Sequence, residues 1–559
     1  MWSKTLLAVA LSILSLQAAA QDIVDDITYL TGASAPEELD VETVEHMSAL
    51  AARPVRINLA TERRLVSSGL FSRYQAASVA DYRRTSGDIL SVAELALLDG
   101  FGKEAARALA PFVSFETRAA PGRSSLEKGR VKTEVQSRGI LQESEGEGSA
   151  NYALKVRTGD EDRWLAAAAA KKASGARFWP QRDLSGSVAV YGRRLPFSIV
   201  LGDFNARFGQ GLLLWSGFSL SGVQSAAAMD RHPSGLSPAW TLSAGSAHRG
   251  AAADISLGRF VLSGFWSYGK CSGANLTWLA RSGQAGVTAL SCYRVSLDWR
   301  WAFGRWDLFG EVAEDFRNHA LAGVAGVAWN PAYQVRFAAL VRGYPAAFDG
   351  SLAGALRSST RSSDERGASF AADYKKLSFT ADVAVHPSKG TGQCKAVLKY
   401  APQVTDHLSL AFRAVSRYRP QDTWPWRSEL RAEAVLTASG GLSLKGCASF
   451  CKSEGFAWLA CLEPGYSLET DSLRWAVYLR GTAFVVDSWE DRIYIYERDI
   501  QGAFSVPAYY GRGCSLSAVT SLKIKKFTLG ARAYATAYPG MAGKKPGKAG
   551  LKLQCMFTF

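Results

Sequence analysis

The stretch from residue 293 to residue 303, YRVSLDWRWAF, places a large apolar side chain at nearly every second position and polar side chains between them. Residues 408–417 (LSLAFRAVSR) and 473–480 (LRWAVYLR) show a similar alternation. Because successive side chains of a β-strand point to opposite faces, each segment predicts a strand with one apolar and one polar face. We expect the apolar face to meet lipid and the polar face to line a lumen, as in a transmembrane β-barrel.

This pattern continues from residue 129 to the end of the chain. At about ten residues a strand plus connections, the segment predicts a large antiparallel barrel of roughly 22 to 26 strands in contact with outer-membrane lipid. Aromatic residues near strand ends suit the membrane interfaces. The arginines on the polar face predict a basic lumen, and the candidates are Arg294, Arg300, Arg413, Arg474 and Arg480.

The last nine residues, LKLQCMFTF (551–559), alternate in the same way and end on Phe559. They resemble the closing strand of bacterial outer-membrane barrels. That resemblance implies the outer membrane as location and the outer-membrane barrel assembly machinery as a partner, since the machinery recognises the terminal aromatic residue.

Short and long connections alternate along the barrel segment. Two-residue turns are predicted at residues 258–259, 304–305, 375–376 and 525–526, which suits the periplasmic side. Longer loops are predicted on the outer side at residues 217–238, 344–366 and 539–548.

The N-terminus has the features of a secretory signal peptide over residues 1–20. Lys4 precedes an apolar stretch over residues 6–16, and Ala18–Ala20 form a small-residue cleavage site. Of the 559 residues, 47% are hydrophobic, and no later apolar run reaches the length of a membrane-spanning helix. We therefore expect an exported protein and exclude a cytoplasmic role.

Charge divides the mature chain into two parts. Residues 21–117 hold nine basic and fifteen acidic residues, a net charge of −6. The chain from residue 118 onward holds 55 basic and 35 acidic residues, a net charge of +20. Residues 118–128 have the composition of a linker. We expect a periplasmic helical domain (21–117), a linker (118–128) and a barrel (129–559).

The helical domain is predicted to contain helices over residues 42–51, 61–67, 73–85, 91–98 and 103–111, with Asn58 and Ser91 as helix caps. Residues 57–61, 65–71, 91–95 and 97–106 resemble a tandem helix-hairpin-helix domain of the kind found in competence DNA receptors. The second hairpin matches the apolar-x-Gly-apolar-Gly pattern, whereas Phe71 replaces the second glycine of the first. Barrels of the Bacteroidota that carry such a domain also have a segment similar to residues 201–212.

The resemblance implies non-specific binding of DNA phosphates, with a role in DNA uptake. A glycine turn before a helix exposes backbone N–H groups that suit a phosphate oxygen. The candidate DNA-phosphate residues are Gly69, Leu70, Gly100, Phe101, Gly102, Lys103 and Arg107. Residues 53–112 carry a net charge of only +3, so one alternative is a packing module that binds protein or nothing. The domain's acidic balance favours another, a structural or assembly barrel whose helical domain docks a periplasmic protein, because DNA would be repelled by the acidic start. A third alternative is an anion-conducting pore.

Two features stay open at this stage. The glycine-rich segment over residues 201–212 predicts either a plug or constriction element, with Asp203 paired to Arg207, or a bulged hairpin. All eight cysteines lie after residue 270 in spacings that fit no metal framework, so we expect small strand residues and an occasional disulfide.

Catalytic chemistry is not expected. The six histidines have no metal-ligand spacing, and no nucleophile-elbow or phosphate-loop motif occurs. His232 beside Asp230, or His386, are the candidates for a catalytic histidine, and isolated loop histidines are the favoured interpretation. We therefore predict no enzyme, no cofactor and no metal.

Overall fold

The structure is a computed structural model that describes residues 23–117, 131–144, 147–160, 163–192, 196–217, 225–242, 247–332, 334–470, 472–539 and 547–559. The predicted signal peptide and linker lie outside these residues. Among the residues described, no helix is long and apolar enough to cross a membrane.

The N-terminal region is a small helical domain with its own apolar core. Asp40, Thr61, Ser72 and Ser91 each accept a backbone N–H at a helix start, which fixes where the helices begin. The helices are α2 (Ile23–Thr31), η2 (Pro36–Glu38), α3 (Val41–Ala52), α4 (Glu62–Ser67), α5 (Arg73–Thr85), α6 (Val92–Leu97), α7 (Gly102–Leu109) and η3 (Ala110–Phe112). The five predicted helices are confirmed, and α2 was not predicted.

One predicted cap is wrong. The side chain of Asn58 binds the backbone N–H and C=O of Ile89, on the far side of the domain, and Thr61 caps α4. Buried polar groups are nearly always hydrogen-bonded, and the buried amide of Asn58 forms its hydrogen bonds with the backbone of Ile89. The amide is therefore not available to cap a helix. Next to it, β1 (Val55–Arg56) pairs in parallel with β2 (Val113–Ser114) and joins the segment after α3 to the end of the domain.

The rest of the chain closes into an antiparallel barrel of 24 strands, within the predicted range. The strands are β3 (Lys132–Ser144), β4 (Glu147–Asp160), β5 (Trp164–Ala173), β6 (Leu184–Tyr191), β7 (Phe197–Arg207), β9 (His248–Leu257), β10 (Phe260–Ser267), β11 (Gly273–Leu279), β12 (Gly283–Leu290), β13 (Arg294–Phe303), β14 (Trp306–Asp315), β15 (Ala320–Ala332), β16 (Val335–Tyr344), β17 (Glu365–Tyr374), β18 (Leu377–His386), β19 (Thr391–Tyr400), β20 (Leu408–Tyr418), β21 (Trp426–Thr437), β22 (Leu442–Lys452), β23 (Phe456–Glu469), β24 (Leu473–Val486), β27 (Gly511–Ile524), β28 (Phe527–Ala537) and β29 (Lys548–Thr558).

Smaller elements occupy the long loops. A further strand, β8 (Gly235–Pro238), pairs with the end of β7. β25 (Ile493–Tyr494) and β26 (Ala508–Tyr509) form a separate hairpin. The short helices are α8 (Pro180–Asp183), α9 (Ala226–Met229), η4 (Ser439–Gly441) and η5 (Trp489–Asp491).

The predicted closing strand is confirmed. β29 pairs with β3 along its whole length, and the backbone of Phe559 exchanges hydrogen bonds with Thr133. The first and last strands therefore lie side by side, and the start of the first meets the end of the last at one end of the barrel. All four predicted two-residue turns lie at that end, and the predicted loop 344–366 and the described parts of the loop 217–238 follow strands that end at the other. Most of the predicted loop 539–548 lies outside the described residues.

The predicted division of faces is also confirmed. On β13, Ser296 and Asp298 are buried, whereas Leu297 between them is 52% exposed. Large apolar side chains such as Trp266, Val341 and Leu516 are exposed on the outside of other strands in the same way. This apolar outer surface is what the hydrocarbon of a bilayer covers.

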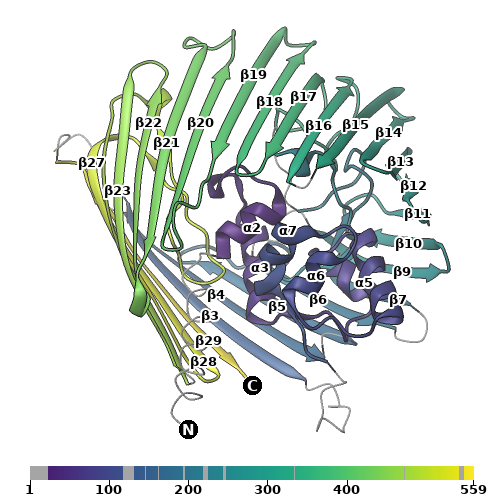
Figure 1. Cartoon of the computed structure of the whole chain (residues 1–559), viewed down its shortest axis with the longest axis horizontal. Helices are drawn as coiled ribbons and strands as arrows, with labels where there is room; N and C mark the ends of the chain where they lie inside the picture. Colours follow the sequence, from purple (N-terminus) through teal and green to yellow (C-terminus); the bar gives the residue numbers. More distant parts are fainter. Residues whose placement is uncertain are drawn as a thin grey trace.

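The helical domain lies inside the ring of strands, as Figure 1 shows for α2, α3 and α5–α7. Its side chains contact inward-facing residues of β4, β9, β19, β20 and β21. This differs from the prediction of a domain that stands apart in the periplasm. The reason is the charge division: an acidic domain and a basic inner wall attract each other. We call residues 23–117 the plug domain.

Candidate functional site

The acidic start of the plug domain is held by cations of the barrel wall. Glu38 lies 3.1 Å from Arg413 on β20 and 3.5 Å from Lys395 on β19. Burial raises the pKa of Glu38, but these two cations together with hydrogen bonds from Ser34 outweigh it, and the pKa is lowered. Glu37 lies 2.6 Å from Arg431 on β21. Each pair joins the plug domain to a different strand.

A second contact is buried deeper in the lumen. Glu45 on α3 lies 2.9 Å from Lys155 on β4 and also accepts the backbone N–H of Leu242. Trp240 packs against the ammonium of Lys155 at 4.5 Å and the ring of His46 at 5.3 Å. The plug domain, the wall and the 208–247 loop therefore meet at one point.

The charges are mixed at the end that carries the short turns. There the plug domain contributes two cations: Arg56 lies 3.3 Å from Asp160 on β4, and Arg63 lies 3.3 Å from Asp254 on β9. It also contributes a carboxylate, since Glu104 accepts a hydrogen bond from Gln334 and lies 3.9 Å from Lys376. The plug domain is thus held around much of its circumference by contacts that depend on charge.

Residues 201–207 of the predicted plug element belong to β7 in the barrel wall, and residues 208–212 turn into the lumen. After β7, the chain turns inward, and Glu311 on β14 accepts the backbone N–H groups of Gln210 and Leu212 at 2.8 Å each. The predicted pair of Asp203 with Arg207 is wrong, because Asp203 binds Arg249 of β9 at 2.6 Å. The register of β7 with β9 places these two residues opposite each other.

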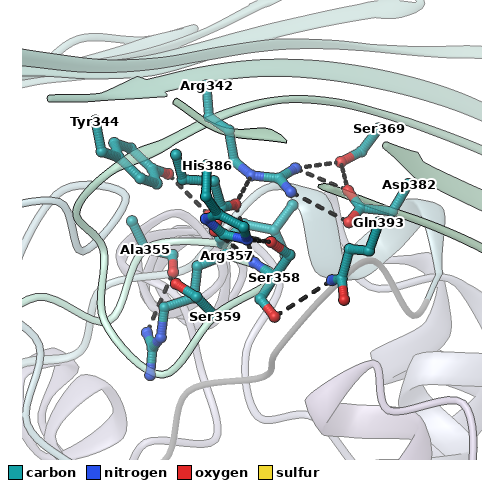
Figure 2. A network of polar contacts seen from close by, with 12 residues as sticks. Arg342, Tyr344, Ala355, Arg357, Ser358, Ser359, Ser369, Asp382, His386 and Gln393 are labelled. Atoms are coloured by element: carbon teal, nitrogen blue, oxygen red, sulfur yellow. Dashed lines mark hydrogen bonds and ion pairs between the residues drawn. The ribbon is translucent and has the colours of Figure 1, made fainter. Parts of the chain in front are cut away.

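The 345–364 loop is fixed above this segment by the network in Figure 2. Arg342 on β16 lies 2.6 Å from Glu365 and 2.8 Å from Asp382, and these side chains are almost fully buried. Glu365 accepts the backbone N–H and the hydroxyl of Ser358 in the loop. The loop is therefore anchored by buried, charge-assisted hydrogen bonds.

The 487–510 loop also folds into the lumen and contacts the plug domain. The backbone N–H of Tyr496 donates to Glu37 at 2.7 Å, and Phe504 packs against the apolar core of the domain. Arg480 on β24 donates to the carbonyl of Tyr496 at 2.9 Å. Asp499 is bound by Arg532 and Lys552 of the wall. The described parts of three long loops thus lie in the lumen beside the plug domain.

The five predicted lumen arginines all lie on the inward face. Arg294 and Arg300 bind residues of the long loops, Asp349 and Asp230 respectively. Arg413 binds Glu38 of the plug domain, and Arg480 binds the 487–510 loop. Arg474, at the end with the short turns, binds Glu469 and is exposed. Four of the five arginines thus bind segments that lie inside the ring of strands.

The predicted DNA-phosphate residues lie on the two hairpins of the plug domain. Gly100, Gly102, Lys103 and Arg107 are exposed, and a side chain at Gly102 would meet no atom within 4 Å. Phe101 is buried against Phe71 at 6.1 Å between ring centroids. In the first hairpin, Gly69 is exposed and Leu70 is half-buried. The second hairpin thus presents a solvent-facing turn.

The candidate catalytic histidines have other partners. Arg300 contacts both His232 and Asp230 at 2.8 Å. His386 lies 3.5 Å from the hydroxyl of Ser358, but that hydroxyl donates to Glu365 at 2.8 Å. These contacts anchor loops, and their geometry does not prepare a serine nucleophile.

Sequence reasoning missed the residues that hold the plug domain, above all Glu37, Glu38 and Glu45. Their signal was present, because the acidic start of the domain stands beside a basic barrel. From the sequence, these acidic residues indicated repulsion of DNA or attraction of a separate protein partner. In the structure they bind cations of the barrel wall in the same chain.

No known family model and no curated protein matches this chain. Among solved structures, the P pilus usher PapC translocation pore has a TM-score of 0.39 at 8% identity, covering 77% of this chain and 99% of that one. OccK5 (OpdH) and the outer membrane protein OprD, both of Pseudomonas aeruginosa, have TM-scores of 0.31 and 0.29 at 8% identity. They cover 77% of this chain and 98% and 92% of their own. At these values the likeness carries no functional argument, and the class, a large outer-membrane-type β-barrel, rests on the strand pairing itself.

Proposed function

We propose that this protein is an outer-membrane channel that its own N-terminal plug domain holds closed. The observation that carries the proposal is the set of ion pairs between the acidic start of the plug domain and four strands of the wall, β4, β19, β20 and β21. Both partners of an ion pair are hydrated once they separate, so a domain held largely by such pairs is suited to reversible displacement. Residues that fill a lumen permanently are expected to pack through apolar surfaces instead.

Two parts of the wall support this division. Inner apolar residues of β5–β17, several of them alanine, form one cluster with residues of the long loops, although these strands also carry inner charges such as Asp254, Glu311 and Arg342. Charged inner residues of β19–β21 meet the plug domain. We infer that the part of the wall lined by the apolar cluster is permanently filled and that a pathway opens along β19–β21.

Planar-bilayer conductance of the mature chain tests the proposal. The wild type is expected to show rare openings, whereas a variant with Glu37→Gln, Glu38→Gln and Glu45→Gln is expected to open frequently. Asp81→Asn is the matched control, since Asp81 is 62% exposed and pairs only with Arg84 of its own helix among the ion pairs of the described residues. Steady conductance by the wild type, or equal silence of the triple variant, would reject the proposal.

DNA binding stays a second candidate, supported by the exposed turn at Gly102 with Lys103 and Arg107. Phosphate contacts predict that binding of duplex DNA to the mature chain weakens as salt rises. Gly100→Val with Gly102→Val should abolish it, because side chains would obstruct the approach of the backbone. Absence of binding at low salt would remove this function and leave the channel proposal untouched.

The predicted partners follow the same proposal. Outer-membrane lipid is supported by the apolar outer surface, and the barrel assembly machinery by the terminal aromatic residue Phe559. A separate periplasmic partner for the acidic start is no longer needed to explain its charge. In a membrane, the end with the short turns and the C-terminus is expected to face the periplasm.

A further inference from the structure

Two rows of cations cross strands β19, β20 and β21 on the inner face of the wall. The strand register places Lys399, Arg413 and Arg431 directly opposite one another on β19, β20 and β21. Toward the end with the long loops, the same register aligns a second row of three cations. We call the two rows the basic wall, and its residues are Lys395, Lys399, Arg413, Arg417, Arg427 and Arg431.

Such an arrangement is unfavourable without anions. Like charges directly opposite each other on adjacent strands destabilise a sheet. The wall itself supplies two inward carboxylates nearby, Glu429 and Glu433, and Glu433 lies 2.9 Å from a further cation, Lys445. The plug domain supplies further carboxylates: Glu37 and Glu38 contact the wall, and Asp25 interacts electrostatically with Lys399. The six cations are thus only partly balanced by their own strands.

The two plug carboxylates occupy this wall in the way a ligand would. Pro36 starts a short turn, η2, that presents Glu37 and Glu38 side by side. Glu37 contacts Arg431 at 2.6 Å, and Glu38 contacts Arg413 at 3.1 Å, each through a guanidinium N–H. Guanidinium groups bind carboxylates and phosphates with the same planar geometry. The turn therefore resembles a bound dicarboxylate.

Binding capacity remains even with the plug domain in place. The Nε atoms of Arg413, Arg417 and Arg431 are buried and have no hydrogen-bond partner among the described residues. A buried donor without an acceptor costs free energy that an oxyanion would recover. Arg417, in the second row, borders Arg427 in the register and therefore adds to a local excess of positive charge.

We propose that the basic wall binds a small solute carrying two or more carboxylate or phosphate groups, and that Glu37 and Glu38 are an internal competitor for that site. This inference rests on the proposed closure by the plug domain and names the class of solute. A solute that takes the place of the two glutamates releases the η2 turn from β20 and β21. Binding and release of the plug domain are then coupled, because both use the same guanidinium groups.

Titration calorimetry of the full mature chain in detergent at low salt tests this inference, with tripolyphosphate and citrate as probes. Glu37→Gln with Glu38→Gln is expected to tighten binding of at least one probe on the order of tenfold, about 1.4 kcal/mol. The better probe tells whether phosphate or carboxylate is preferred. Adding Arg413→Gln and Arg431→Gln should remove the gain.

Two controls keep the result interpretable. Arg474→Gln in the same background should leave the gain intact, because Arg474 lies on the inward face outside the basic wall. If the quadruple variant does not fold, Arg417→Gln replaces it, since the buried Nε of Arg417 has no hydrogen-bond partner to lose among the described residues. Equal affinity of wild type and the double glutamine variant, or a gain that survives loss of the wall arginines, would overturn the inference.

The assay does not depend on conductance. Binding that follows the predicted pattern in a protein that never conducts would refute the channel and keep the anion site. Conductance that follows the plug variants without any binding of either probe would keep the channel and refute the anion site.

Discussion

The carboxylate of Glu45 on α3 lies 2.9 Å from the ammonium of Lys155 on β4, and both side chains are 2% exposed. This ion pair joins the plug domain to the barrel where water is excluded. Removing one partner of such a buried pair leaves an uncompensated charge, which costs about 3 to 5 kcal/mol.

Lys155→Met is therefore expected to weaken the attachment of the plug domain to the barrel by about 3 kcal/mol. The double variant, Lys155→Met with Glu45→Gln, is expected to weaken this attachment by clearly less. Limited proteolysis of the plug domain and thermal unfolding measure both. Arg84→Gln, which breaks the exposed pair with Asp81 on α5, should change neither. Equal losses in the single and double variants would contradict the buried-charge explanation.

Gly32 at the end of α2 touches the 208–247 loop closely. A Cβ at Gly32 would lie 2.5 Å from the Cβ of Ala228, and the backbone has φ of +74°. Gly32→Ala is expected to cost about 2 to 4 kcal/mol, from left-handed backbone strain plus overlap. Gly102→Ala has the same backbone strain at φ +77° with no atom within 4 Å, and should cost about 1 kcal/mol. Similar melting temperatures for the two variants would show that the contact with Ala228 is loose.

The stability of the plug domain should fall in acid. Burial, together with the positive charges of Arg207, Arg157 and Arg64, lowers the pKa of His46 to about 4, although its hydrogen bond with the Ser68 carbonyl opposes the shift. The unfolded chain binds a proton near the ordinary pKa of about 6.5, so stability is lost as pH falls from there toward 4. The full loss is at most about 3 kcal/mol.

Thermal unfolding between pH 7.5 and 4 measures this dependence. His46→Gln keeps a donor for the Ser68 carbonyl and should flatten the profile in this window. His407→Gln, at an exposed turn residue, should leave the profile unchanged. An unaltered pH profile in the His46 variant would contradict the assignment.

Cys271 and Cys292 form a disulfide between two turns at the end with the long loops. The pair is consistent with export to an oxidising compartment. Cys271→Ser with Cys292→Ser is expected to lower stability by about 2 to 4 kcal/mol, because the bond closes a loop of 21 residues. Cys514→Ala, at a free cysteine, is the control. Peptide mapping under non-reducing conditions that finds both thiols free would refute the disulfide.

Several features of the fold were predictable because they depend on local pattern. Alternation over residues 293–303 and 551–559 identified strands and their lipid-facing side, and helical spacing with capping residues identified the helices of the plug domain. In each case a side chain's direction follows from its position in one strand or helix. The short and long connections likewise separated the two ends of the barrel.

The location of the plug domain and its site was decided by tertiary structure alone. Glu37 and Arg431 are 394 residues apart, and they meet because barrel closure carries β21 past a domain that precedes every strand. Net charges of −6 and +20 stated that an attraction exists. The net charges did not show which residues make the contact, because composition carries no information on which surfaces face each other. Only the strand register, which aligns Lys399, Arg413 and Arg431, and the inward path of the chain determine that.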